Sequence, residues 1–484
     1  MSPLTEGVDR GDLYRVRFDR THSLGDIRST HGDLPPGSES GELVRVAGRL
    51  MTKREHGKVW FADLQDWTGR IQLYAHVDHL GDRFKLLQQL DVGDWVGAWG
   101  NVVTTRRGEL SVRLEGFELL TKSRRPLPEK WHGLGNVEGR YRRRYLDLMT
   151  SEDAREILRA RSATVAAIRS WLTEQAFIEV ETPMLQPVPG GALAEPFVTH
   201  HKALGMDLYL RIAPELYLKR LLVGGVERVF EINRNFRNEG VSTQHNPEFT
   251  MLEVYQAFAD YHDMAELLEG LIRHTAMAVG GSLRLSYRGH GIDLEAPFRR
   301  ARLIDLVKEA GVDPEGDLLG ACEGLGIAHD PRWPWGKLLL EIYEKKVEPA
   351  LFQPTFVMDI PREVSPLART HRSDPRFTEH LDLVIAGMEI APAYSELTDP
   401  LEQRARFEAQ AGLRSGGDRE AHRLDDAFLE ALEYGMPPAG GLGLGIDRLV
   451  MVLTDSASIR EVILFPALRP EQALSATAPR ALKR

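Results

Sequence analysis

The sequence predicts an α+β protein in which helices flank an antiparallel sheet, with a small β-barrel earlier in the chain. At 484 residues the chain is too long for one ordinary core, so we expect two or three domains. In the C-terminal two thirds, strand patterns come as hairpins and helical patterns lie outside them, as in α+β folds. Nearer the N-terminus, short strand patterns recur between glycine-containing turns. No sequence repeat of about 20–50 residues is apparent, so we do not expect a repeat architecture.

The composition excludes several classes of protein. A hydrophobic content of 42% and a charged content of 27% are typical of soluble globular proteins. There is no apolar run long enough to span a membrane and no apolar signal at the N-terminus, so we expect a cytoplasmic protein without membrane contact. Cys322 is the only cysteine, which rules out an internal disulfide and a cysteine-built zinc site. The formal charge of −10 argues against a broad basic coat.

A local basic patch is still present at Arg140–Arg144. It is interpreted either as a solvated helix start or as a contact for nucleic acid or a second subunit.

The first part of the chain is expected to contain an extension and a barrel. Residues 1–40 are polar and become rich in Gly, Pro and Ser, which is typical of a linker. Five strand patterns follow, with a short helical pattern at 84–90 between the third and the fourth, and this order fits an oligonucleotide-binding barrel over residues 41–121. Residues 122–140 form a second linker punctuated by proline. The five strand patterns lie at 42–51, 59–66, 70–77, 94–104 and 109–120.

Residues 141–484 are expected to form one larger domain. A helical pattern from 152 to 175 precedes a strand pattern that starts at Phe177 and stops at Pro183. Residues 280–350 have mixed helix and loop character and are interpreted as an insertion. Further strand patterns lie at 207–213, 228–238, 248–256, 354–359 and 380–394, and helical patterns at 214–222, at 263–279 and in the segment ending at Leu453.

The most informative segment is residues 228–255, two strand patterns joined by a polar loop. Side chains on a strand alternate between two faces, so each strand has one polar face. A buried charge needs a partner or a ligand, and the hairpin is therefore expected to be the floor of a site for a charged, flat molecule. The alternative is a surface hairpin with a solvated polar face. The predicted site face carries Glu231, Asn233, Asn235, Arg237 and Glu239 on the first strand, and Phe249, Met251, Glu253 and Tyr255 on the second.

A glycine run at Gly440–Met451 passes into an apolar helix. Glycines allow backbone to approach a ligand closely, and the start of the helix presents its positive end, near which Arg448 can reach an anion. Tight packing of a helix on a sheet would also require small residues at these positions.

Asp382 and Glu389 are candidate metal ligands. If Ala386 and Gly387 form a hairpin turn, residue 384 pairs with Glu389, and Asp382 is its diagonal neighbour on the same face. Two carboxylates at such a short separation either bind a divalent cation or repel each other. Mg²⁺ is the favoured cation beside phosphates. Edge charges that discourage sheet aggregation are the alternative.

Two further glutamates are candidate site residues. Strict alternation places Glu396 on the face opposite to Glu389, but an irregularity near Pro392 would bring it to the same face. Glu215 is either a site residue or half of an ordinary helix pair with Lys219.

Taken together, these segments closely resemble the class II lysyl-tRNA synthetases of the bacterial type. The helix up to Gln175 with FIEVETPML resembles the first class II motif. The segment RVFEINRNFRNEG with HNPEFTMLE resembles the second, and GLGLGIDRLVM resembles the third. Subgroup features also match, including the N-terminal barrel, KWHGLGNVEGRYRRRYLDL and RIAPELYLKRLLVGG. The resemblance covers roughly residues 12–470.

The resemblance implies a lysine–tRNA ligase, a homodimer that forms lysyl-adenylate and pyrophosphate from lysine and ATP. Lysine then passes to the 3′ end of tRNA(Lys). Arg237 and Arg448 would be catalytic, and Asp382 and Glu389 would bind several Mg²⁺ ions. The implied ATP contacts are Arg237, Glu239, His245, Asn246, Phe249 and Arg448. The implied lysine contacts are Gly191, Glu215, Arg237, Glu253, Tyr255, Tyr394, Glu396 and Gly445.

The resemblance also assigns Phe61 and Gln72 to an anticodon base, read by stacking and by an edge contact. Ordinary barrel core is the alternative for Phe61. Some positions depart from the family pattern. Pro392 and Tyr394 stand where Asn and Phe are common, Asp382 where Glu is common, and Glu195 where Arg is common. Because Pro392 stands where Asn is common, more of the binding of the substrate carboxylate would depend on Arg237.

Two other functions compete with this one. A synthetase-like enzyme could lysylate something other than tRNA, but the complete anticodon-type barrel argues against it. An RNA-binding or regulatory protein with a degenerate catalytic domain is disfavoured, because the charged site residues are intact.

Overall fold

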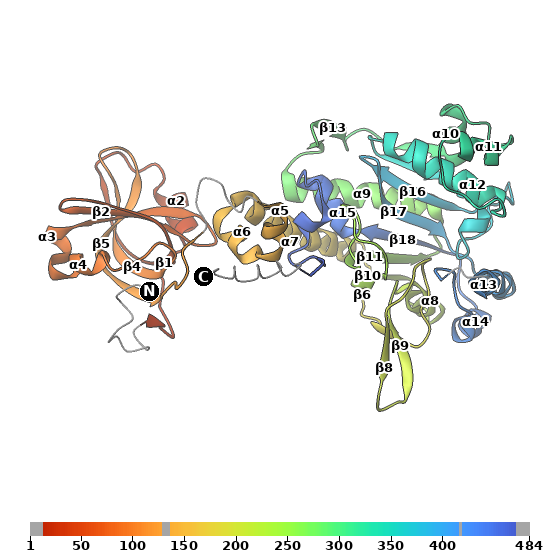
Figure 1. Cartoon of the computed structure of the whole chain (residues 1–484), viewed down its shortest axis with the longest axis horizontal. Helices are drawn as coiled ribbons and strands as arrows, with labels where there is room; N and C mark the ends of the chain where they lie inside the picture. Colours follow the sequence, from red (N-terminus) through yellow and green to blue (C-terminus); the bar gives the residue numbers. More distant parts are fainter. Residues whose placement is uncertain (1–12, 128–135, 416–418, 471–484) are drawn as a thin grey trace, which may run out of the picture. The chain divides into compact units, whose positions relative to one another are not determined.

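The computed structural model describes residues 13–127, 136–415 and 419–470. The chain divides between Gly135 and Asn136 into two compact units, labelled by element in Figure 1. Within the described residues, no helix is long and apolar enough to cross a membrane.

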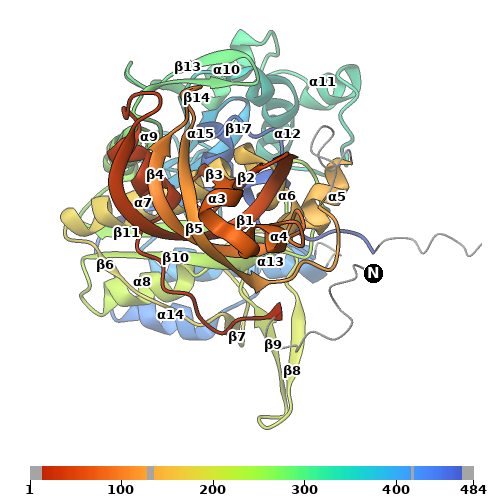
Figure 2. The same ribbon diagram turned by 90° about the vertical axis from the view of Figure 1, so that its left-hand side faces the viewer.

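The first unit is a closed five-stranded barrel with the strand order β1-β2-β3-β5-β4, and Figure 2 labels its five strands. All five predicted strands are present. Alternate side chains point inward, so Val44, Val46 and Leu73 are fully buried in the barrel core. The strands are β1 (Glu39–His56), β2 (Val59–Gln65), β3 (Arg70–His76), β4 (Trp95–Thr104) and β5 (Leu110–Thr121).

Two parts of the first unit differ from the expectation. The helix predicted at 84–90 is shorter, α4 (Phe84–Leu87), and it is preceded by α3 (Val77–Leu80) and a 3-10 turn, η2 (Gly81–Arg83), which were not predicted. The expected extension contains α2 (Leu24–His31), which Ser23 begins with a capping box. Leu24 and Ile27 of α2 are buried in the barrel core, so this helix belongs to the barrel.

The second unit is built on an eight-stranded sheet of order β14-β15-β16-β17-β18-β11-β10-β6. The six central strands pair antiparallel, and the outermost pair on each side is parallel, so the predicted antiparallel α+β architecture is confirmed. The strands are β14 (Arg299–Arg302), β15 (Thr355–Met358), β16 (His380–Ile385), β17 (Met388–Ser395), β18 (Ala439–Gly445), β11 (Glu248–Ala257), β10 (Arg228–Phe236) and β6 (Ile178–Glu179).

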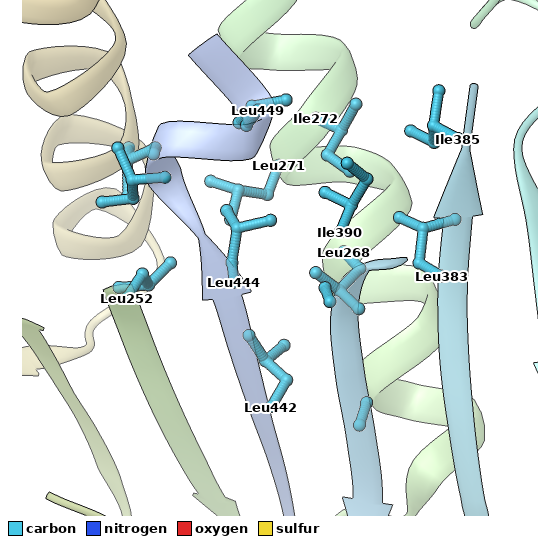
Figure 3. Packing of buried hydrophobic residues seen from close by; sticks show 14 of the residues in the cluster. Leu252, Leu268, Leu271, Ile272, Leu383, Ile385, Ile390, Leu442, Leu444 and Leu449 are labelled. Carbon is cyan, nitrogen blue, oxygen red and sulfur yellow. The ribbon is translucent and has the colours of Figure 1, made fainter. Parts of the chain in front are cut away.

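Helices cover one face of this sheet. Figure 3 shows leucine and isoleucine side chains of the strands packed on α9 (Tyr261–Gly280), with Leu449 of α15 (Ile446–Leu453) beside them. α7 (Glu152–Glu174) completes the layer. Each fully buried Leu or Ile contributes about 1.5–3 kcal/mol. This face therefore stabilises the unit, and the opposite face is available for polar side chains.

The strand predicted to start at Phe177 is only two residues long, because β6 lies at the sheet edge and pairs with Val229 and Phe230 alone. The chain continues into a three-stranded sheet and α8. These elements are β7 (Leu185–Gln186), β8 (Val198–His201), β9 (Met206–Leu210) and α8 (Glu215–Val223).

The segment 280–350, which was predicted to be an insertion, is integrated into the second unit. Its β14 extends the main sheet, and its helices share a core with Val357 and Val384 of that sheet. Its other elements are β12 (Arg284–Tyr287), β13 (His290–Asp293), α10 (Leu303–Glu309), α11 (Leu318–Gly324), α12 (Trp335–Ile342) and a π-helical turn, η3 (Tyr343–Val347). Three helices without a sequence prediction follow later in the described residues, α13 (Pro400–Ser415), α14 (Asp426–Glu433) and α16 (Ile459–Val462).

The basic patch lies in α5 (Val137–Arg142) and α6 (Arg144–Thr150). Arg140 and Arg144 both pair with Asp147, at 2.9 and 2.8 Å, and Arg144 is only 3% exposed. Arg140 therefore joins α5 to α6, Arg144 pairs within α6, and neither is a freely solvated cation.

Candidate active site

The hairpin of β10 and β11 forms the floor of the site. Glu231 pairs with Glu253, Asn233 with Met251 and Asn235 with Phe249, so the predicted polar faces do lie side by side. Glu231 and Glu253 are 3% and 4% exposed, which shows that the solvated-surface alternative is wrong.

The two paired glutamates have different surroundings. Glu231 accepts hydrogen bonds from buried Arg211 at 2.6 Å and from the Thr182 hydroxyl at 2.7 Å, so its charge is neutralised within the protein. Glu253 accepts a hydrogen bond from the Tyr255 hydroxyl at 3.2 Å. Burial, followed by the neighbouring carboxylate of Glu215, holds the pKa of Glu253 well above its usual range. A cation placed beside Glu253 would stabilise its ionised form.

The glycine run in β18 alternates by face. Leu442 and Leu444 belong to the helix-covered core, while Gly441 and Gly443 lie on the site face. A Cβ atom at Gly441 would be 2.0 Å from Glu396 Oε1 and 2.6 Å from the Tyr255 ring. The glycine therefore makes room for two predicted site residues.

Arg448 lies in the first turn of α15 and is held by its contacts. Its Nη1 donates to the Glu389 carbonyl at 2.5 Å, and its Nη2 lies 3.1 Å from His245 Nε2. Partial burial and the adjacent Arg448 and Arg237 cations lower the pKa of His245. Asp447 anchors the same turn, because it accepts hydrogen bonds from Arg161 and from the Thr250 amide.

A first cavity, here called the Arg448 cavity, contains every residue predicted to contact ATP. The Arg237 guanidinium lies 5.1 Å from the centre of the Phe249 ring inside it. Gly445 also lines this cavity, although the resemblance assigned it to lysine. The predicted ATP residues that line it are Arg237, Glu239, His245, Asn246, Phe249 and Arg448.

A second cavity, here called the Glu253 cavity, contains most residues predicted to contact lysine. Arg237, Met251, Glu389 and Pro392 line both cavities, so the two are adjacent and Arg237 lies between them. The Glu253 cavity is lined by Gly191, Glu215, Arg237, Glu253, Tyr255 and Tyr394, together with Asp382 and Glu389.

The position of Glu396 depends on a β-bulge. The turn at Ala386 and Gly387 has positive φ at both residues and pairs Val384 with Glu389, as predicted. The next pair is Leu383 with Ala391, so Ile390 is an extra residue. The bulge reverses the alternation, and Pro392, Tyr394 and Glu396 consequently share the site face with Glu389. The predicted irregularity near Pro392 is confirmed, and it lies at Ile390.

Glu396 and Glu215 both contact Lys219, which sequence reasoning considered only as half of an ordinary helix pair with Glu215. Lys219 Nζ lies 2.6 Å from Glu215 Oε1 and 2.5 Å from Glu396 Oε2, and the lysine is fully buried. The helix pair proposed as the alternative for Glu215 therefore exists, but inside the protein. The only feature of the sequence that indicated a contact between Glu215 and Lys219 was their i,i+4 spacing.

Asp382 and Glu389 line the Glu253 cavity together. Burial raises the pKa of Glu389, Arg448 opposes this, and the Asp382 charge raises it further. Glu348, from the segment 280–350, adds a third carboxylate whose Oε1 accepts from the Glu389 amide at 3.3 Å. Burial, Glu389 and Asp382 raise the pKa of Glu348 to about 8. Sequence reasoning missed Glu348, because no pattern links it to the hairpin.

These oxygen donors fit Mg²⁺. Among the described residues, no group of three or more His, Cys, Asp or Glu side chains could hold a metal ion unaided. Phosphate oxygens also suit this ion.

The barrel carries a separate groove in the first unit. Phe61 stacks on Tyr74 with ring centres 5.3 Å apart, and Phe61 is outside the buried barrel core, so the core alternative is wrong. Gln72 Oε1 accepts from Ser111 Oγ at 3.1 Å. Arg54, Arg106 and Arg113 line the same groove, which therefore combines stacking surfaces with positive charge.

Comparison with known proteins agrees with this geometry. Residues 136–469 match the family model described as tRNA synthetases class II (D, K and N), and residues 44–120 match an OB-fold nucleic acid binding domain. The lysine–tRNA ligase of Carboxydothermus hydrogenoformans is 53% identical over 94% of both chains. That of Xanthomonas oryzae pv. oryzae is 53% identical over 96% of this chain and 94% of the relative. That of a Synechococcus species is 54% identical over 95% and 93%. The chain therefore belongs to the class II tRNA synthetases, in the family of the lysine–tRNA ligases.

Proposed function

We propose that the chain condenses lysine with ATP to form lysyl-adenylate and pyrophosphate and then transfers lysine to the 3′ end of tRNA(Lys). The observation that carries this proposal is the position of Arg237, which lines both the Arg448 cavity and the Glu253 cavity. A residue at that junction contacts two ligands at the point where they react.

Arg237 brings two anions together. The lysine carboxylate must attack the α-phosphorus, and a planar guanidinium can bind both groups and offset their repulsion. Arg237 Nε is buried without a hydrogen-bond partner among the described residues, so it is free to take a ligand. Pro392 has no side-chain donor, which leaves the substrate carboxylate to Arg237.

The Arg448 cavity suits ATP. Phe249 offers an aromatic face for adenine, and Arg448, held by Glu389 and His245, supplies a fixed positive charge for the terminal phosphates. Asp382 and Glu389 would hold Mg²⁺, which neutralises phosphate charge when it is bound. No covalent intermediate with the protein is required.

The Glu253 cavity suits lysine, whose side chain ends in a compact cation. Glu253, Tyr255 and Glu396 are proposed to bind the ε-ammonium group, and Glu215 with the Gly191 backbone the α-amino group. Glu396 Oε1 is buried without a hydrogen-bond partner in the described part of the chain, which makes it a free acceptor for an ammonium group.

The groove on the barrel suits an anticodon. Phe61 and Tyr74 would stack on a base and Gln72 would contact its edge, while the arginines neutralise phosphates.

We also propose a homodimer in the cytoplasm. Exposed Ile178, Met184 and Leu185 around β6 and β7 support a subunit contact there.

The test is pyrophosphate exchange into ATP, measured with each of the twenty amino acids in turn. We expect exchange with lysine alone, followed by charging of tRNA(Lys) when tRNA is added. Exchange that is absent, or supported better by another amino acid, would reject the proposal. Lysylation of a protein in preference to tRNA would favour the alternative enzyme.

A further inference from the structure

Lys219 has no place in the reaction described above, yet it is the most deeply buried cation of the site. It lies on α8 with 0% of its surface exposed, and its Nζ contacts Glu215 and Glu396 at 2.6 and 2.5 Å. The two glutamates come from separate elements, the start of α8 and the residue that follows β17. Removal of a charge from water is costly, so a lysine is rarely kept here without a reason.

The charges of the residues proposed to bind the two ammonium groups of lysine suggest that reason. Glu215, Glu253 and Glu396 are three carboxylates, and Lys219 is one ammonium, so this set carries two net negative charges when it is ionised. Glu344, Asp382 and Glu389 also line the Glu253 cavity and are not counted in this set. Free lysine brings two ammonium groups, and its carboxylate is proposed to meet Arg237. Within this set the charges balance only if Lys219 is counted.

We propose that Lys219 is a specificity-determining positioning residue, an internal ammonium that holds Glu215 and Glu396 in place and sets the pocket to the two charges of lysine. This inference rests on the proposed function of the site. Lys219 acts through the two carboxylates and does not touch the reacting atoms.

The geometry of Glu396 supports a separate role for each of its two carboxylate oxygens. Its Oε2 forms an ion pair with Lys219, while its Oε1 lies against the Gly441 position away from that pair, and neither oxygen has a hydrogen-bond partner among the described residues. One oxygen therefore serves the resident ammonium and the other is left for the substrate. Glu215 is likewise shared between Lys219 and the cavity, because Lys219 contacts its Oε1 and the residue also lines the Glu253 cavity.

The loss of Lys219 would change how Glu396 titrates. Burial raises the pKa of Glu396 to about 7 although Lys219 opposes this shift, so without Lys219 the carboxyl would stay protonated at neutral pH. Burial and Lys219 lower the pKa of His422 to about 4, so this neighbour is neutral and cannot replace the cation. The other titratable or charged groups around Glu396 are Glu215, Tyr255 and Tyr394, and, in a separate pocket that Glu396 lines, Arg369, Arg372, Glu379, Asp260 and Asp263.

The first test is Lys219→Met, measured by pyrophosphate exchange with lysine and ATP varied separately between about pH 6.5 and 8.5. We expect the KM for lysine to rise at least about tenfold at neutral pH, with the KM for ATP changed less than about twofold. Lysine must then expel a proton from Glu396, so this KM should fall by up to about tenfold per pH unit as the pH rises.

The control is Lys122→Met in the barrel. Lys122 is 4% exposed and lies 2.7 and 2.8 Å from Asp91 and Asp94, so it is an equally buried lysine between two carboxylates, outside the site. Exchange in this variant should match the wild type at every pH.

The decisive test is a double-mutant cycle with Glu396→Gln. The single change leaves Lys219 unbalanced and should weaken lysine binding, whereas Lys219→Met combined with Glu396→Gln removes one charge of each sign and restores two net negative charges. We expect the double variant to bind lysine at least about fivefold better than Glu396→Gln, without the added pH dependence. If Lys219→Met alone fails to fold, the double variant still tests the inference, because the ammonium of Lys219 and the carboxylate of Glu396 are removed together.

Three results would overturn the inference. They are an unchanged lysine KM in Lys219→Met, an equal rise in the KM values for lysine and ATP, and a double variant no better than Glu396→Gln. Wild-type protein without lysine-dependent exchange would reject the proposed function itself, which is a different result.

Discussion

The replacement of Gly441 by alanine tests the lysine pocket most directly. The new Cβ would lie 2.0 Å from Glu396 Oε1 and 2.6 Å from the Tyr255 ring, whereas ordinary contacts begin at 3.4 Å. Because β18 is held on both sides by β11 and β17, the strand itself cannot move away. Glu396 must therefore shift by about 1.4 Å, and displacements of about 1 Å can cost about a hundredfold.

We accordingly expect Gly441→Ala to raise the KM for lysine about a hundredfold, which corresponds to about 2.7 kcal/mol. The KM for ATP should change little, because Gly441 does not line the Arg448 cavity. The assay is pyrophosphate exchange with each substrate varied in turn, together with thermal unfolding. Overpacking should lower the stability by about 1–3 kcal/mol.

Gly443→Ala is the matched control on the same face of the same strand. Its Cβ would meet only the flexible end of Met251, at 3.0 Å, which can rotate away. We expect a change of less than about threefold in the KM for lysine. An unchanged lysine KM in Gly441→Ala, or equal effects of the two substitutions, would refute the placement of Glu396 in the pocket.

Three further predictions follow from the site and the barrel. Arg237→Ala should abolish lysine-dependent exchange while circular dichroism stays native, because no other residue lines both cavities with a positive charge; near-normal exchange would contradict the role of Arg237. Phe61→Ala should raise the KM for tRNA by about 5- to 150-fold through the loss of about 1–3 kcal/mol of stacking, with exchange unaffected, and equal effects on both assays would argue against an anticodon groove. Burial and Lys219 lower the pKa of His422 to about 4, so between about pH 6.5 and about 4 the unfolded chain binds a proton that the folded chain does not. Stability should therefore decrease by up to about 3 kcal/mol as the pH falls through this window, and His422→Leu should reduce the slope of the unfolding free energy against pH.

Much of the fold could be predicted from local patterns. Strict alternation defined which side chains of β10 and β11 share a face, and the observed pairing of Glu231 with Glu253 agrees with those faces. The α2 helix was missed because a polar, proline-rich neighbourhood obscured the spacing of Leu24 and Ile27. The short β6 could not be predicted, because its length depends on how far its partner strand extends.

The sequence by itself determined which residues are candidates for the chemistry, since strand alternation and motif order are local properties of the chain. It identified Arg237, Phe249, Glu253 and Arg448 before any contact was known. Only the tertiary structure decided how distant residues meet. The bulge at Ile390 brings Glu396 to the site face, and the fold buries Lys219 between Glu396 and Glu215. Burial and charge balance are sums over residues far apart in sequence, so no local pattern could reveal them.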